Sequence, residues 1–127
     1  MSEALTAKSG ASTEQRLRYL EQLGSTKIGL QNANFALITR RSMASIEESR
    51  QIDIDVSQNK AEYAKMSAAY VLYFAQDVKF RPPTQAEFDA VKAEVEKIDK
   101  IVVANDKASK IMASATALIQ AFKSTQA

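Results

Sequence analysis

The residue types and spacing between positions 53 and 60 match the start of two known chemical motifs. Asp53, Asp55 and Ser57 alternate with apolar residues as in the first half of an EF-hand calcium loop. Gln58 stands where that loop needs glycine, and Ala64 stands where it needs a bidentate glutamate. In a helix, Asp53 and Asp55 would project about 200° apart and could not share a cation. We therefore predict that this stretch binds no metal.

The second motif is Ser57-x-x-Lys60, which matches the S-x-x-K of penicillin-binding enzymes. The S-D-N and K-T-G motifs of those enzymes do not follow, and 127 residues are too few for their fold. The chain has no cysteine and no histidine, so it offers no thiolate and no imidazole for nucleophilic catalysis, acid–base catalysis or metal binding. We therefore predict a protein that is not an enzyme, with no catalytic residue and no cofactor.

Charge also gives little indication of a partner. The 17 basic and 15 acidic residues leave a net charge of +2, which creates no field for nucleic-acid binding. Arg40, Arg41 and Arg50 form the one local basic cluster, and Glu47-Glu48 is an acidic pair close by. We interpret both as solvated helix faces, and we do not expect a nucleic-acid partner.

The sequence also predicts no membrane-spanning segment. Its longest apolar run is Ala68–Ala75, well short of the roughly 20 residues that cross a bilayer. The N-terminal residues carry an acid at Glu3 and no apolar stretch, so they do not resemble a secretion signal. We expect a cytoplasmic protein, although export without a signal would leave no trace in the sequence.

Three glycines and two prolines in 127 residues are too few for the frequent turns of a β-sheet protein. The composition therefore predicts an all-α fold. We expect a flexible arm over residues 1–12 and a single helical domain over 13–127. Its helices should span about 13–23, 27–80 and 84–124, with a break at Gly24–Gly29 and a turn at Pro82-Pro83. Thr84 and Glu87 form a capping box that starts the last of them.

A single helix over residues 84–125 would be about 63 Å long, whereas a compact chain of this size is about 36 Å across. Either the helix breaks at Asn105-Asp106, or the molecule is elongated. We favour an elongated antiparallel hairpin of two long helices, with the short N-terminal helix packed alongside in bundle or coiled-coil fashion. Apolar residues at heptad-like spacing, such as Ile28, Phe35 and Ile38, support packing along the whole helix.

Aromatic residues gather around the Pro82-Pro83 turn, where residues 70–74 are apolar on every side of a helix. They either close the end of the hairpin or contact another chain, and the two roles are compatible. The candidate protein interface comprises Tyr63, Tyr70, Tyr73, Phe74, Phe80 and Phe88.

The leading functional hypothesis is a non-enzymatic structural or assembly subunit that forms a homo-oligomer through its long amphipathic helices. One alternative is an adaptor or inhibitor of a specific protein, which binds through the Tyr70–Phe88 end. A further alternative is an amphipathic coat on lipid or polymer granules. In composition the chain resembles Ala-, Ser- and Gln-rich helical proteins that coat or build assemblies, such as phasins and R-body subunits; no functional residue follows from this likeness.

Overall fold

The computed structural model describes residues 13–75, 83–104 and 107–123, and every regular element among them is an α-helix. The expected all-α class is therefore confirmed. The four helices are α2 (Thr13–Arg41), α3 (Ile46–Ala75), α4 (Gln85–Ala104) and α5 (Ala108–Lys123). The predicted arm over residues 1–12 lies outside the described residues.

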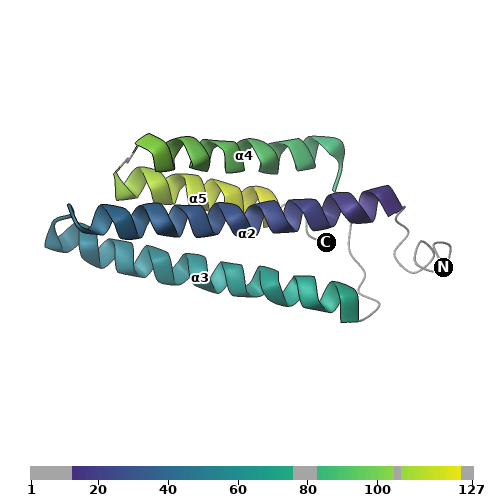
Figure 1. Cartoon of the computed structure of the whole chain (residues 1–127), viewed down its shortest axis with the longest axis horizontal. Coiled ribbons are helices and arrows are strands. Elements are labelled where there is room, and N and C mark those ends of the chain that lie inside the picture. The colour runs from purple at the N-terminus through teal and green to yellow at the C-terminus, as the bar shows by residue number, and fades with distance from the viewer. Residues whose placement is uncertain (1–12, 76–82, 105–106, 124–127) are drawn as a thin grey trace.

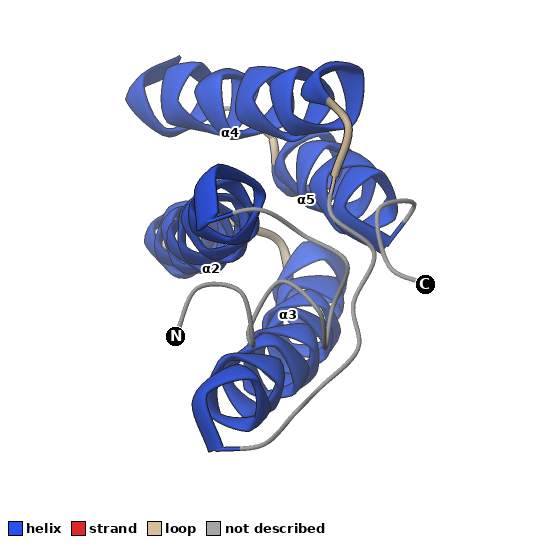
Figure 2. Ribbon diagram, turned by 90° about the vertical axis from the view of Figure 1, so that its right-hand side faces the viewer, coloured by secondary structure: helices blue, strands red, loops and turns tan. Residues whose placement is uncertain are grey.

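Successive helices run in opposite directions, as Figure 1 shows. In Figure 2, α4 lies at the top and α3 at the bottom, with α2 and α5 between them. Helix α2 packs against all three other helices, whereas α3 packs mainly on α2 and more lightly on α5. Because α3 and α4 hardly meet, the hairpin that we expected across Pro82-Pro83 is wrong. The closely packed hairpins are α2 with α3 and α4 with α5.

The predicted helix break at Gly24–Gly29 is also wrong, because α2 runs through both glycines without interruption. A glycine within a helix costs only about 1 kcal/mol relative to alanine, and packing readily outweighs that amount. Gly29 has a packing role of its own: a Cβ there would lie 2.7 Å from Leu118 Cδ2, so its absence lets α5 approach α2 closely. A Cβ at Gly24 would meet no atom within 4 Å, so no packing within the described chain requires that glycine.

The first break falls instead at residues 42–45, within the helix that we expected over 27–80. At this break, serine hydroxyls form hydrogen bonds with backbone groups at the two helix ends. Ser42 Oγ donates to the Thr39 carbonyl (3.0 Å), and Ser45 Oγ accepts from the Glu48 amide (3.1 Å). Serine competes with helical hydrogen bonds in this way and favours helix ends. The sequence Ser45-Ile-Glu-Glu48 fits the S-x-x-E pattern that starts a helix, a signal that our sequence analysis missed.

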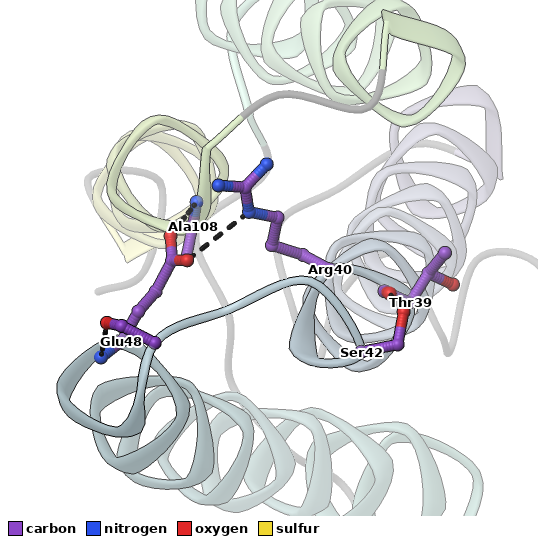
Figure 3. Close-up of polar contacts among 6 residues, drawn as sticks. Thr39, Arg40, Ser42, Glu48 and Ala108 are labelled. Carbon is purple, nitrogen blue, oxygen red and sulfur yellow. Dashed lines mark hydrogen bonds and ion pairs between the residues drawn. The ribbon is translucent and has the colours of Figure 1, made fainter.

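Glu48 links three helices at this end of the bundle (Figure 3). Its Oε1 accepts from Arg40 Nε at the end of α2 (3.3 Å), and its Oε2 accepts from the backbone amide of Ala108 at the start of α5 (3.3 Å). The Arg40 and Glu48 side chains are 24% and 23% exposed, so neither is the fully solvated charge that we expected. A carboxylate at a helix N-terminus also interacts favourably with the helix dipole.

Replacing Glu48 with glutamine is therefore expected to lower the free energy of unfolding by about 1–2 kcal/mol, since hydrogen bonds to a charged, partly buried group weaken. Urea denaturation followed by circular dichroism measures this change. Glu47→Gln is the matched control, because Glu47 is exposed on the same turn of α3. Equal effects of the two substitutions would contradict the role assigned to Glu48.

The helix expected over residues 84–124 is likewise two helices, α4 and α5, so the single long helix on which the elongated form rested is wrong. The alternative break near Asn105-Asp106 agrees with this division. Residues 105 and 106 themselves lie outside the described residues. The buried positions in α5 come one residue earlier in the sequence than a heptad repeat continued from α4 would place them. Val91 and Ile98 are buried in α4, and a seven-residue repeat continued from them would bury Met112 and Ile119. The buried residues of α5 are instead Ala108, Ile111, Ala115, Leu118 and Phe122.

The capping box before α4 is confirmed. The Glu87 amide donates to Thr84 Oγ1 (3.1 Å), and the Thr84 amide donates to Glu87 Oε1 (3.0 Å). We expect Thr84→Ala to lower the free energy of unfolding by about 1 kcal/mol, because the substitution leaves an N-terminal amide of α4 without its acceptor. Thr84→Ser keeps the hydroxyl and is the control, and chemical denaturation compares the two. A loss for serine as large as that for alanine would refute the capping explanation.

Candidate interaction surface

Helix α2 carries two separate rows of residues at heptad spacing, and the first faces the other helices. Its members are at most 5% exposed: Tyr19, Leu23, Thr26, Leu30, Ala33 and Leu37. Alternating steps of four and three residues keep such a row on one side of a helix. This row is the centre of the bundle core, because α3, α4 and α5 all pack on α2.

The second row of α2 faces outward. Its large members are Leu17 (61% exposed), Ile28 (56%), Phe35 (65%) and Ile38 (55%). Gly24 lies on the same line of the helix, between Leu17 and Ile28. Within the part of the chain that the structure describes, no helix covers this row, which we call the outer row. We had expected Ile28, Phe35 and Ile38 to pack along the helix, but among the described residues each remains more than half exposed.

A groove of about 350 Å³ lies beside the outer row, between α2 and α3. Its walls are mainly apolar, with a few polar side chains among them. The lining residues are Leu30, Gln31, Asn34, Phe35, Ile38, Asn59, Lys60 and Tyr63.

The floor of the groove is held by a pair of asparagines. Asn59 Nδ2 donates to Asn34 Oδ1 (2.9 Å), and Asn34 Nδ2 donates to the Val56 carbonyl (3.4 Å). Among the described residues, the buried Asn59 Oδ1 has no hydrogen-bond partner. These bonds connect α2 to α3, so the groove has a fixed floor beneath its apolar walls.

Lys27 continues this surface toward the N-terminal end of α2. Its Nζ lies 5.0 Å from the ring centre of Tyr63 and 5.4 Å from that of Tyr70, both on α3. A lysine over aromatic rings at this separation is held by cation–π attraction. The Tyr63 hydroxyl also accepts from Gln31 Nε2 (3.2 Å). Two predicted interface residues, Tyr63 and Tyr70, therefore lie together beside Lys27, and Tyr63 also lines the groove.

The other predicted interface residues do not join them among the described side chains. Phe88 is half-buried on α4, on the opposite side of α2, where it lines a small pocket with Glu21 and Lys92. Tyr73, Phe74 and Phe80 have side chains outside the described residues. The Tyr70–Phe88 surface that we expected is thus described only at its two ends. Phe35 and Ile38 border the groove instead; their spacing was visible in the sequence, but not which row of α2 would be buried.

The two aspartates of the EF-hand-like stretch turn to different partners. Arg41 donates to both carboxylate oxygens of Asp53, at 3.0 and 3.2 Å. These hydrogen bonds lower the pKa of Asp53 and raise the pKa of Arg41 from their ordinary values. Asp55 is buried and accepts from Gln51 Nε2 (2.9 Å). No cluster of three or more potential metal ligands occurs among the described residues.

In comparisons with known proteins, the chain matches no family model, no curated protein and no solved structure. None of the described helices has the length and apolar character needed to cross a membrane. The case for a function therefore rests on the physical character of the surface that α2 and α3 present.

Proposed function

We propose that this protein is a non-enzymatic structural or assembly subunit that self-associates through the outer row of α2 and the adjoining groove. The observation that carries the proposal is the pair of heptad rows on one helix. One row, including Leu23 and Leu30, forms the core, and the other, including Ile28 and Phe35, has the same spacing but no cover within the described chain. A helix with two such rows suits a position between neighbours on both sides.

Energetics supports this reading of the outer row. Burying a leucine, isoleucine or phenylalanine side chain completely is worth about 1.5–3 kcal/mol. Leu17, Ile28, Phe35 and Ile38 are each more than half exposed, so each stands to gain about 1 kcal/mol from a partner. Apolar residues exposed one by one are ordinary on protein surfaces, but a line of them beside an apolar groove is typical of interaction sites.

The alternative is an adaptor or inhibitor, in which a different protein, rather than a second copy, covers the exposed apolar surface. Tyr70 is 40% exposed and its neighbour Val71 is 62% exposed, which favours a contact at this end of α3. The aromatic residues of the Tyr70–Phe88 end that would decide this alternative lie largely outside the described residues. Loss of partner binding, without loss of folding, on Tyr73→Ala or Phe80→Ala would support it over self-association.

Coating of a lipid or polymer granule is the third proposal. The outer row is an apolar helix face available to a surface, which is what such a coat needs. Co-sedimentation of the protein with liposomes or granules would support this proposal, and failure to co-sediment would exclude it.

Size-exclusion chromatography with multi-angle light scattering tests self-association directly. We expect a mass above the 14.0 kDa of one chain at tens of micromolar, and a larger mass at the higher of two concentrations. Raising the salt concentration should not dissociate the assembly, because apolar contacts are not screened. A mass of 14.0 kDa at every concentration would refute self-association and leave the alternatives.

A further inference from the structure

We infer that two copies of this chain pair through α2 in antiparallel orientation, with Ile28 of each copy packed on Gly24 of the other. This inference rests on the proposed function, and it specifies the occupant of the outer row. Three features support this pairing: Gly24, the order of side chains along the outer row, and the size of the exposed surface.

Gly24 is a glycine in the middle of a long helix that the bundle itself does not require. Gly29 is explained by the approach of Leu118, whereas a Cβ at Gly24 would meet no atom within 4 Å. Glycine weakens a helix, so one within a helix usually marks a close approach by another backbone or side chain. Gly24 lies on the outer row, which no described helix covers, and we assign the approach that would explain it to a second copy of the chain.

The order of residues along the outer row favours an antiparallel partner. When the two-fold axis lies level with residue 26, Ile28 of one copy faces Gly24 of the other, and Leu17 faces Phe35. Glu21 then faces Gln31, an acceptor opposite a donor. A parallel pair in register would instead place Gly24 opposite Gly24, which leaves a gap, and Glu21 opposite Glu21, which repels.

The surface is also large enough for a stable pair. From Leu17 to Ile38 the row is about 32 Å long, and the outward half of a helix about 11 Å wide then presents about 550 Å². A stable dimer buries about 800 Å² on each partner. The adjoining face of α3, where Tyr63 lines the groove and Tyr70 is 40% exposed, would add to this area.

Cysteine cross-linking tests the orientation cleanly, because the natural sequence has no cysteine. Two single variants are made, Glu21→Cys and Gln31→Cys, and one carries a tag that changes its size on a gel. After mixing and oxidation we expect the disulfide between the two different variants to predominate, because those positions face each other in the antiparallel pair. In either variant by itself, the two cysteines would be about 15 Å apart along the helix.

Each outcome decides between the inference and the proposed function. Predominance of disulfides between identical variants would show parallel pairing and overturn the inference. Light scattering could show an oligomer while the disulfides between different and identical variants form only in the proportions expected from random collision. The copies would then associate through another face, so the inference would fail while the proposed function would stand. A monomer by light scattering without disulfides would overturn both.

Gly24→Leu provides an independent test of the close contact. The substitution improves helix propensity and meets open space within the chain, so the monomer should fold. We expect the dissociation constant of the dimer to rise about tenfold or more, because the leucine fills the place of Ile28 from the second copy. Ala61→Leu, at an exposed site on α3 away from the groove, is the matched control and should leave dimerisation unchanged. Equal dissociation constants for Gly24→Leu and the wild type would contradict the inference.

Discussion

Replacing Phe35 with glutamate is expected to raise the dissociation constant of self-association at least 100-fold while leaving the helical fold in place. Phe35 is 65% exposed, so within the bundle the substitution removes little packing. In the assembled state it would remove a large apolar contact and bring a charge into an apolar interface, and an unpaired buried charge costs several kcal/mol. A factor of 100 corresponds to only about 2.7 kcal/mol.

The dependence of the unfolding temperature on protein concentration measures this effect. Association of folded chains stabilises them by mass action, so the melting temperature of the wild type should rise with concentration. The melting temperature of Phe35→Glu should be nearly independent of concentration. Ala61→Glu places the same charge at an exposed site on α3 away from the outer row and should behave as the wild type does. A wild-type melting temperature that does not change with concentration would argue against association.

The second large effect is expected at the inner row of α2, which is the buried row that includes Leu23, Leu30 and Leu37. Leu30 is 1% exposed, and Leu30→Ala should lower the free energy of unfolding by about 2–5 kcal/mol, because it removes buried methyl groups and leaves a cavity. Urea denaturation of the folded chain measures the loss. Since domains of this size are stable by only about 5–15 kcal/mol, the variant is expected to be markedly weakened or unfolded at 37 °C.

Phe35→Ala is the matched comparison for Leu30→Ala, because Leu30 is 1% exposed and Phe35 is 65% exposed on the same helix. Under conditions where the chain is monomeric, we expect Phe35→Ala to change the free energy of unfolding by less than about 0.5 kcal/mol. A loss for Phe35→Ala as large as that for Leu30→Ala would mean that the outer row belongs to the core of the chain.

Much of the fold could be predicted from local signals. The scarcity of glycine and proline excluded a sheet protein, and the capping box of Thr84 and Glu87 located the start of α4. These predictions succeed because they depend on backbone chemistry within a few residues. The stretch Gln51–Val56, which alternates as a strand does, lies within the continuous helix α3, in agreement with the helical interpretation of its surroundings.

The predicted break in α2 was wrong because local preferences are small beside tertiary packing. A break was expected at Gly24 and Gly29. Two glycines destabilise a helix by only about 2 kcal/mol together, and burying residues such as Leu23 and Leu30 stabilises it by more. The break at residues 42–45 does have a local signal, because Ser45 caps the Glu48 amide, and that signal was overlooked. The contact from Glu48 to Ala108, sixty residues away, has none. No local pattern reveals a contact of that sequence separation.

The candidate surface was predictable in kind but not in position. Heptad spacing marked Ile28, Phe35 and Ile38 as residues that pack against a neighbour, yet the inner row with Leu23, Leu30 and Leu37 has the same spacing. Only the arrangement of α4 and α5 on one side of α2 determines which row is buried and which is exposed. The pairing of Tyr63 and Tyr70 beneath Lys27 likewise depends on how α3 lies against α2.

Sedimentation equilibrium of the wild type and Phe35→Glu side by side tests whether the outer row of α2 joins copies of this chain. At tens of micromolar, we predict a wild-type mass well above the 14.0 kDa of one chain and a variant mass close to that value. Equal masses for the two proteins, whether monomeric or assembled, would contradict the claim that this row is the interface.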